Sequence, residues 1–370
     1  MTGDITVPVL LRNGPEECDY YFPGGDVATY WINSDLLIEP GTVLRFGINA
    51  ILYVDNAGSI TAIGEPGARI LFEGEEAVDG YWHGLCFEEN RESRLEYVDV
   101  RWAGKAWSTS GNSCRGAIAG SYPGGETVHI KNSSVSGSYV SGLSAHYLTL
   151  GEFANNAFFD NREYGVNVHA EQVSKLDPAT DYLGSDNGAV NGKPYVYAGG
   201  YFTDPGEYHV WHNLNAPYFV SDQEPDYPRE LAVYDGTGLI IDAGTTMVFE
   251  GAAELYVYGG AALGIAGTPD NRVVLTGLTA ERGSWSGLKI EGSAAILNYV
   301  DILWGGREEY FEGSLVFIEI GEDTTGKELR DVYIDGSANC ALMIWHDDIS
   351  GFDPLDVRFG TNNEEDSCRR

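Results

Sequence analysis

The feature that most constrains the fold is a long internal duplication. The stretch LLIEPGTVLRFG begins at Leu36, and LIIDAGTTMVFE begins at Leu239, 203 residues later. Read without gaps, the two copies stay aligned as far as Glu88 and Glu291. Their identical positions include Gly41/Gly244, Thr42/Thr245, Phe46/Phe249, Leu52/Leu255, Tyr53/Tyr256, Val54/Val257, Arg69/Arg272, Trp82/Trp285 and Gly84/Gly287. A duplication of this length indicates repeated structural units.

A shorter period runs inside each copy. Apolar clusters recur every eight residues, at 36–38, 44–46, 52–54 and 60–62, and again at 239–241, 247–249, 255–257 and 263–265. Each cluster alternates in polarity, as a short strand does when its successive side chains face opposite sides. Turn-forming residues such as those of the GEPG stretch separate the clusters. We therefore expect Leu52 and Val54 to point into a core.

Two all-β architectures fit short strands joined by tight turns: an antiparallel sandwich or barrel, and a parallel β-solenoid. Three strands of about eight residues make a coil of about 24, which is the size of one solenoid turn. Equivalent strands of such a solenoid pair along its axis, so that like side chains stack in ladders. The repeated Val, Ile and Leu and the Asn-rich stretch at 153–161 suit these ladders, and we favour the solenoid.

The segments LLIEPGTVLRFG, IGEPGARILFEG, GYWHGLCFEE and RLEYVDVRWAG resemble the secreted right-handed parallel β-helix repeat proteins of bacterial cell surfaces, within the pectin-lyase-like superfamily. The resemblance covers residues 35 to about 177 and again 238 to about 359. It implies an all-β, right-handed parallel β-helix with two tandem homologous modules. It implies little about activity, because this superfamily includes lyases, hydrolases and adhesins, and a fold does not determine a function.

The expected organisation follows the two copies. Residues 1–34 form an N-terminal lead-in that caps its own helix or supplies a strand to a neighbouring chain. Residues 35–200 form the first module, with junction loops to about 237, because the interval 181–234 lacks the eight-residue spacing. Residues 238–359 form the second module. Residues 360–370 are expected to be a flexible tail.

The net charge restricts the partners. The chain has 22 basic and 56 acidic residues, giving a formal charge of −34 at pH 7. Such a surface repels phosphate backbones, so nucleic-acid binding is not expected. No apolar run approaches the roughly 20 residues of a membrane-spanning helix. The opening lacks the basic start and apolar centre of a leader, so we expect a cytosolic chain or a mature portion. The family resemblance favours an extracellular or cell-surface location.

The cysteines suggest disulfides and not zinc. The five are Cys18, Cys86, Cys114, Cys340 and Cys368, and none belongs to a CxxC or Cys/His pattern. An odd number leaves at least one unpaired within the chain. Cys18 and Cys368 lie near the ends of the sequence, where a disulfide would fix a fraying end, but spacing alone leaves the pairing open.

Two groups of residues are candidates for binding. Asp222, Glu224 and Asp226 alternate in a Pro-containing loop and could hold Ca²⁺, a cation that prefers oxygen ligands; a solvated acidic loop is the alternative. Tyr53 and Tyr256 should point outward if their neighbours point inward, and outward aromatic rings contact sugars or proteins. Calcium is the one cofactor that these residues suggest.

No catalytic set is expected. Nucleophile, phosphate-binding and zinc-protease motifs are absent from the sequence. His209 and His212 are three positions apart in an extended segment, so they should face opposite ways. Arg69 and Trp82 recur as Arg272 and Trp285, which favours shared structural roles.

These observations favour a structural or adhesive protein outside the cell that self-associates end to end or by strand addition into a filament. A carbohydrate-binding surface protein, with cell-surface glycans as partners, is the alternative. A polysaccharide lyase or glycoside hydrolase is the third choice, since it requires carboxylates that converge across a cleft.

Overall fold

The computed structural model describes residues 3–26, 28–56, 58–88, 91–109, 112–121, 127–223, 230–291, 294–307, 313–318, 327–345 and 356–369. These residues form strands joined by turns, together with two short 3₁₀ helices, η1 (Ala170–Lys175) and η2 (Ser185–Asn187). They divide into two compact units. The first holds mainly residues 1–168 and 175–196, and the second mainly 197–213 and 217–370.

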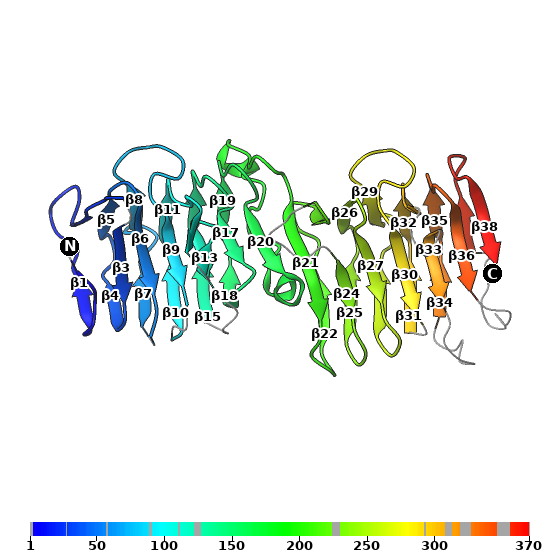
Figure 1. Ribbon diagram of the computed structural model, residues 1–370, viewed down its shortest axis with the longest axis horizontal. Coiled ribbons are helices and arrows are strands. Elements are labelled where there is room, and N and C mark those ends of the chain that lie inside the picture. The colour runs from blue at the N-terminus through cyan, green and yellow to red at the C-terminus, as the bar shows by residue number, and fades with distance from the viewer. Residues whose placement is uncertain are drawn as a thin grey trace. The chain divides into compact units, whose positions relative to one another are not determined.

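In the first unit the chain contributes to three parallel sheets in turn, so that each sheet takes every third strand except where an added hairpin at 107–114 intervenes (Figure 1). The A sheet contains β3 (Ala28–Ile32), β6 (Ala50–Val54), β9 (Gly84–Phe87), β14 (Ile118–Gly120), β17 (Leu143–Ala145) and β20 (Val166–His169). The B sheet contains β1 (Val9–Leu11), β4 (Asp35–Ile38), β7 (Ser59–Ile63), β10 (Ser93–Glu96), β15 (Thr127–Lys131) and β18 (Thr149–Ala154). The C sheet contains β2 (Tyr20–Phe22), β5 (Val43–Phe46), β8 (Ile70–Gly74), β11 (Val98–Arg101), β16 (Ser134–Ser136) and β19 (Ala157–Phe159).

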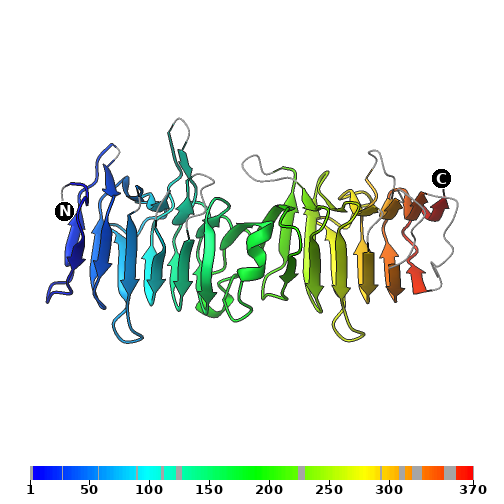
Figure 2. The same cartoon turned by 90° about the horizontal axis from the view of Figure 1, so that it is seen from below.

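The second unit repeats this arrangement (Figure 2). Its A sheet contains β21 (Val196–Phe202), β24 (Leu231–Val233), β27 (Glu254–Val257), β30 (Gly287–Glu291), β33 (Gly313–Ile318), β36 (Cys340–Trp345) and β38 (Glu365–Arg369). Its B sheet contains β22 (Tyr208–Trp211), β25 (Gly238–Asp242), β28 (Ala262–Ala266), β31 (Ala294–Asn298) and β34 (Lys327–Arg330). Its C sheet contains β23 (Tyr218–Ser221), β26 (Thr246–Glu250), β29 (Val273–Gly277), β32 (Val300–Leu303), β35 (Val332–Asp335) and β37 (Val357–Phe359).

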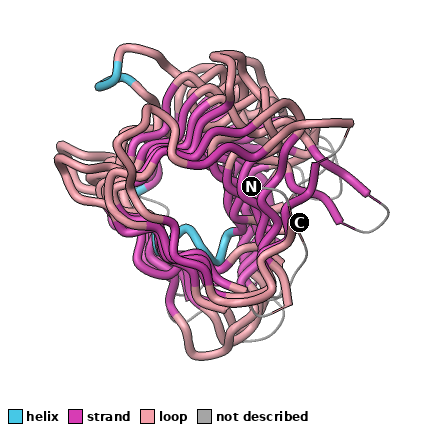
Figure 3. The backbone as a smooth tube through the Cα atoms, turned by 90° about the vertical axis from the view of Figure 1, so that its left-hand side faces the viewer, coloured by secondary structure: helices cyan, strands magenta, loops and turns pink. Residues whose placement is uncertain are grey.

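The all-β class and the long parallel sheets are therefore confirmed. Strands that are neighbours in these sheets run in the same direction, so the antiparallel sandwich is excluded. In the end-on view of Figure 3, strands gather into separate groups with loops between them. This pattern is consistent with a β-solenoid.

Ladders of aliphatic residues build the core of each unit. In the first unit, registered residues of the A sheet stack in the order Leu52, Leu85, Ile118, Leu143 and Val166, all at most 1% exposed. The second unit has the equivalent ladder Leu231, Leu255, Leu288, Leu315 and Leu342, all at most 2% exposed. Burial of each such side chain stabilises the fold by about 1.5–3 kcal/mol. Like residues stack because strand pairing brings equivalent positions together.

Aromatic stacking is also repeated in the two units. Phe46 stacks on Trp82 with 4.0 Å between ring centroids, and Phe249 stacks on Trp285 at 4.3 Å. Both tryptophans are fully buried. The indole nitrogen of Trp82 donates to the carbonyl of Arg101, and that of Trp285 donates to Leu303, which satisfies the buried donor. Their matched contexts in the sequence therefore reflect packing.

Single residues with left-handed backbone separate the B and C strands. Asn132 follows β15 with φ of 52°, and Asn155 follows β18 with φ of 53°. Asparagine tolerates this conformation better than most residues with a Cβ. Tyr97 and its counterpart Tyr299 occupy the same turn with φ of 50° and 47°. Asn155 of the Asn-rich stretch 153–161 thus forms one of these sharp turns.

Two disulfides lie in the structure, one in each unit. Cys86 pairs with Cys114 and Cys340 with Cys368, each across a sequence separation of 28. Among the described residues Cys18 is the one cysteine outside a disulfide. Cys114 ends the antiparallel hairpin of β12 (Trp107–Thr109) and β13 (Asn112–Cys114), which interrupts the alternation of sheets between β11 and β14.

The lead-in takes one of its two expected forms, and two other segments differ from their expected structure. The lead-in pairs with its own unit, because β1 registers Val9 against Leu36 of β4. The interval 181–234, expected to be loops, contains β21 to β24 within its bounds or at its edge. Residues 360–370, expected to be a flexible tail, contain β38, which pairs with β36 through Ser367 and Leu342. The sequence did not predict β21 to β24 or β38, because their spacing or their polar residues hide the alternation.

The last of these segments also repeats a hydrogen-bond ladder. Asn161 accepts from the backbone of Ser138 at 3.1 Å, and Asn363 accepts from the backbone of Ser337 at 3.0 Å. Each amide group then donates to a carbonyl, that of Val135 or of its counterpart in β35. The second copy therefore has its own Asn-rich close, which the sequence comparison missed.

Candidate functional site

A tyrosine paired with a glutamate recurs on the outer face of both A sheets. Tyr53 lies on β6 and Tyr256 on β27, and the side chains next to them in sequence point into the core. The Tyr53 hydroxyl donates to the Glu88 carboxylate. The Tyr256 hydroxyl donates to Oε2 of Glu291 at 3.2 Å. The pair is thus part of the duplicated plan, and the identity of the two glutamates in the aligned copies was the signal for it.

In the first unit this pair is covered. Tyr53 faces outward, as expected, yet it is fully buried, so its predicted exposure is wrong. The disulfide brings the end of the β12–β13 hairpin onto this face. Tyr53 packs there in an apolar cluster with Ile51, Cys86, Cys114 and Ala119, against Trp31. A contact with a ligand at Tyr53 stays a prediction.

The covered pair continues as a short hydrogen-bonded chain. The Tyr53 hydroxyl lies 2.9 Å from Oγ of Ser121, which is 3% exposed. Since Tyr53 donates to Glu88, Ser121 donates to the phenol oxygen. The chain satisfies buried polar groups that would otherwise destabilise this face. Ser121 belongs to no recognised sequence motif, so the sequence alone did not indicate it.

In the second unit the equivalent face carries a row of tyrosines. Tyr256 is half-buried and stacks on Tyr258 at 4.2 Å between centroids. Tyr258 stacks on Tyr234 at 4.7 Å, and Tyr234 meets the edge of Tyr201 at 6.2 Å. Tyr201 is 45% exposed. Because three of the rings stack on one another, the row offers solvent mainly ring edges, hydroxyl groups and the exposed Tyr201.

Burial and nearby negative charge raise the pKa of two tyrosines of the row, Tyr256 and Tyr258. Burial, followed by the negative charge of Glu291, raises the pKa of Tyr256 well above its usual range. Burial, followed by the neighbouring Tyr234 and by acidic groups, raises the pKa of Tyr258 to about 12. The Tyr256 and Tyr258 hydroxyls therefore keep their protons well above neutral pH.

Charged groups flank the row. Lys289 is registered against Tyr256, is 5% exposed and places Nζ 2.5 Å from Oε2 of Glu254. A buried ammonium requires such a partner, since an uncompensated charge is strongly unfavourable there. Phenol hydroxyls, carboxylates and an ammonium thus lie together on one face. This set can donate and accept hydrogen bonds to a ligand that is rich in hydroxyl groups.

The predicted calcium ligands are only partly described. Asp222 is half-buried, lies against Gly251 and accepts from Nε2 of Gln223 at 2.5 Å. Glu224 and Asp226 lie outside the described residues. Calcium binding at this loop therefore stays a prediction.

The two histidines of the HVWH stretch face apart, as expected. His209 is buried against Phe202, at 4.6 Å between ring centroids. His212 directly follows β22 and is half-buried, with Nδ1 2.7 Å from Oδ2 of Asp242. They cannot share a metal ion.

The repeated arginines connect neighbouring strands. Arg69 donates through Nε and Nη2 to Oδ1 of Asp99, at 2.9 and 2.7 Å, and through Nη1 to the carbonyl of Asn132 at 2.8 Å. Arg272 makes the same contacts to Asp301 and to the carbonyl of Asp331, both at 2.8 Å. Each guanidinium therefore joins three successive turns of chain, which is a structural role.

No family model, curated protein or solved structure matches this chain. Within the described ranges, no helix has the length and apolar character needed to cross a membrane.

Proposed function

We propose that the chain is a right-handed parallel β-helix of two tandem modules that serves as a structural and adhesive protein outside the cell. The observation that carries the proposal is the parallel pairing, in both units, of strands that are mostly three apart in chain order. Parallel strands joined by crossovers are right-handed in about 98% of cases, which supports the hand. Repeated units of this kind form rigid scaffolds, because each contacts its neighbours along the sequence.

Disulfides and charge support the location. Two disulfides are typical of proteins that mature in an oxidising compartment. A net charge of −34 keeps such a scaffold soluble and resists non-specific association. Association of copies must then be specific and must tolerate repulsion, which divalent cations would reduce.

The edge of the first B sheet is the surface that we propose for self-association. Among the described strands β1 pairs with β4 alone, so its other edge has unpaired backbone groups. Leu10 of β1 and Leu37 of β4 are registered and are 43% and 41% exposed. An incoming strand would pair with β1 and cover these leucines.

Negative-stain microscopy with and without Ca²⁺ tests assembly. We expect fibres of the unmodified chain. We expect Leu10→Lys to abolish them, because a charge at an edge strand opposes strand addition. Ile296→Lys is the matched control: Ile296 is 46% exposed on β31, which has partners on both sides. Dispersed particles under both conditions, or equal effects of the two variants, would contradict the assembly proposal.

A second candidate function is glycan binding, and the tyrosine row of the second unit favours it. Exposed tyrosine edges with nearby carboxylates suit a neutral oligosaccharide, whereas a polyanionic one would be repelled. A glycan array followed by titration calorimetry tests this function. Tyr201→Ala should weaken binding, and Tyr208→Ala is the control, because Tyr208 is 63% exposed on the B sheet, outside the row. Equal affinities would argue against the row as the binding surface.

A further inference from the structure

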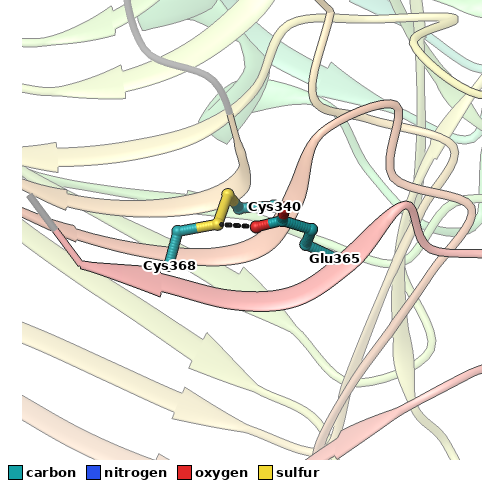
Figure 4. Close-up of side chains that lie close together, drawn as sticks. All are labelled: Cys340, Glu365 and Cys368. Carbon is teal, nitrogen blue, oxygen red and sulfur yellow. Dashed lines mark hydrogen bonds between the residues drawn. A yellow bond between two sulfur atoms is a disulfide. The ribbon is translucent and has the colours of Figure 1, made fainter.

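The Cys340–Cys368 disulfide differs from the other disulfide in having a carboxylate beside it. Cys340 begins β36, and Glu365 and Cys368 lie on the adjacent β38 (Figure 4). The register places Cys340 directly opposite Glu365. Oε2 of Glu365 lies 2.9 Å from Sγ of Cys368. The ligand atoms of the three residues all lie within 4.8 Å of one another.

The Cys86–Cys114 disulfide provides the contrast. It has the same sequence separation of 28 and a similar Cα–Cα distance, 6.0 Å against 5.8 Å. Its neighbours in the packed cluster are Ile51, Tyr53 and Ala119, none of which is a metal ligand in its neutral form. Among the described residues, the group formed by Cys340, Glu365 and Cys368 is the one set of three cysteine, histidine or acidic side chains close enough to share an ion.

We propose that this disulfide, once reduced, becomes a metal site in which Cys340, Cys368 and Glu365 bind a zinc-like divalent cation. Reduction by a phosphine breaks the S–S bond, oxidises the phosphine to its oxide with oxygen from water, and leaves two thiols. The cation then displaces one proton from each thiol and binds two thiolates and the existing carboxylate. The disulfide and the metal complex are therefore alternative states of the same residues.

The chemistry of the three groups favours such a cation. Two thiolates and a carboxylate this close together repel one another, and a divalent ion removes most of that repulsion. Sulfur and carboxylate oxygen are established zinc ligands, and three protein ligands leave a fourth position open. The CxxC spacing expected of zinc sites is absent because the two cysteines come from paired strands and not from one turn.

The surroundings fix one of the three ligands and leave the other two accessible to solvent. Cys340 is 6% exposed and packs with Val316 and Met343, so its side chain is fixed on the sheet. Glu365 is exposed and Cys368 half-buried, which gives an ion a path from solvent. The apolar neighbours lower the local polarity and strengthen the attraction between the ion and its ligands.

Cobalt titration of the reduced full-length chain tests the proposal. The variant C18S/C86S/C114S leaves Cys340 and Cys368 as the remaining cysteines, and the reductant is removed under argon before Co²⁺ is added. We expect one Co²⁺ per chain, an absorption band of thiolate-to-cobalt charge transfer, and release of two protons per ion, since the ligands must be deprotonated. Zn²⁺ should displace the cobalt and abolish the band.

Ligand variants then assign the roles. Glu365→Gln should weaken Co²⁺ binding by more than about tenfold, since even the loss of outer-shell partners costs about 10–100-fold. Glu364→Gln is the matched control, a neighbouring carboxylate outside the group. Cys368→Ser should greatly weaken the charge-transfer band, because it removes one of the two thiolate ligands. Circular dichroism and hydrogen exchange of 365–369 check that β38 stays paired after reduction.

Two results would overturn the proposal. An absent charge-transfer band at millimolar Co²⁺ would mean that the reduced cysteines do not bind a metal, whether or not β38 stays paired. Equal affinities of Glu365→Gln and Glu364→Gln would mean that Glu365 is not a ligand.

Discussion

Replacing Arg69 by methionine removes a guanidinium that joins β8, β11 and the turn before β16, and keeps much of the aliphatic volume. The substitution deletes the two hydrogen bonds to Asp99, the one to Asn132, and a fourth to the carbonyl of Val98 at 3.1 Å. Asp99 then keeps Ser134 as its closest described partner, at 2.6 Å. The change therefore tests how much the arginine contacts that recur in both units contribute to the free energy of unfolding.

The burial of the pair sets the magnitude. The side chain of Asp99 is 12% exposed and that of Arg69 is 32% exposed. Breaking a fully buried ion pair costs about 3–5 kcal/mol, because a charge is left without compensation. Solvent reaches about a third of the arginine and reduces this figure. We expect Arg69→Met to destabilise the first unit by about 2–4 kcal/mol.

Arg94→Met is the control. Arg94 pairs with Glu92, but the two side chains are 44% and 53% exposed. Such surface pairs contribute about 0–1 kcal/mol. Both arginines are in the first unit, so their variants can be compared by hydrogen exchange over the same strands. Exchange under increasing urea is preferable to one global transition, because two compact units need not unfold together.

A double-mutant cycle identifies the cause. Arg69→Met leaves Asp99 with the longer ion pair to Arg101, at 3.4 Å, so its charge is only partly compensated. Asp99→Asn removes that charge, so the double variant should be less unstable than the sum of the single variants predicts. The coupling should fall within about 0.5–3 kcal/mol, as for other residues in contact. Additive effects, or a loss in Arg69→Met no larger than in Arg94→Met, would refute this explanation.

Three further changes have expected outcomes. Replacing Cys86 and Cys114 by serine should cost about 3–4 kcal/mol, from the entropy of a loop spanning 28 residues, as measured by urea unfolding of the first unit; an effect under about 1 kcal/mol would contradict the constraint. Burial lowers the pKa of His83 below 6.5, so the unfolded chain takes up a proton first as pH falls. The stability that this histidine contributes is complete above pH 6.5 and declines below it, and His83→Gln should show a smaller decline from pH 7 to 5; parallel pH profiles would exclude this role. Asn155→Val should destabilise the chain by about 1–2 kcal/mol because of its left-handed backbone, whereas Asn155→Gly should stay within about 0.5 kcal/mol, and equal melting temperatures for the two variants would argue against backbone strain.

The sequence predicts the buried side of the strands well. Apolar agreement between the two copies identifies Leu52 and Val54 as core residues, and both are fully buried. Repetition of Arg69 and Trp82 predicts structural roles, and both make the same contacts as their counterparts. These predictions succeed because a residue kept in both copies must satisfy the same local geometry twice.

The repeat does not predict which outward-facing residues are buried under another segment of the chain. Tyr53 faces outward, as the alternation with its neighbours predicts. Its burial, however, depends on a hairpin that has no counterpart in the other copy, and on a disulfide. The spacing of the cysteines does not show which of them pair. The strand β38 was missed for a related reason. Its sequence EDSCR has no alternation of apolar and polar residues from which a strand could be predicted. Backbone pairing with β36 and a disulfide hold the strand in place.

The pairing of every third strand has a consequence for how the length of such a chain can change. Ile265 of β28 lies between Ile241 of β25 and Leu297 of β31. Excising one whole set of three strands would bring Ile241 against Leu297, two aliphatic residues that already share a neighbour. Inserting a set would separate them by a similar residue. Genetic gain or loss of such a set therefore leaves the remaining contacts chemically compatible, and selection can adjust the number of sets without redesigning the core.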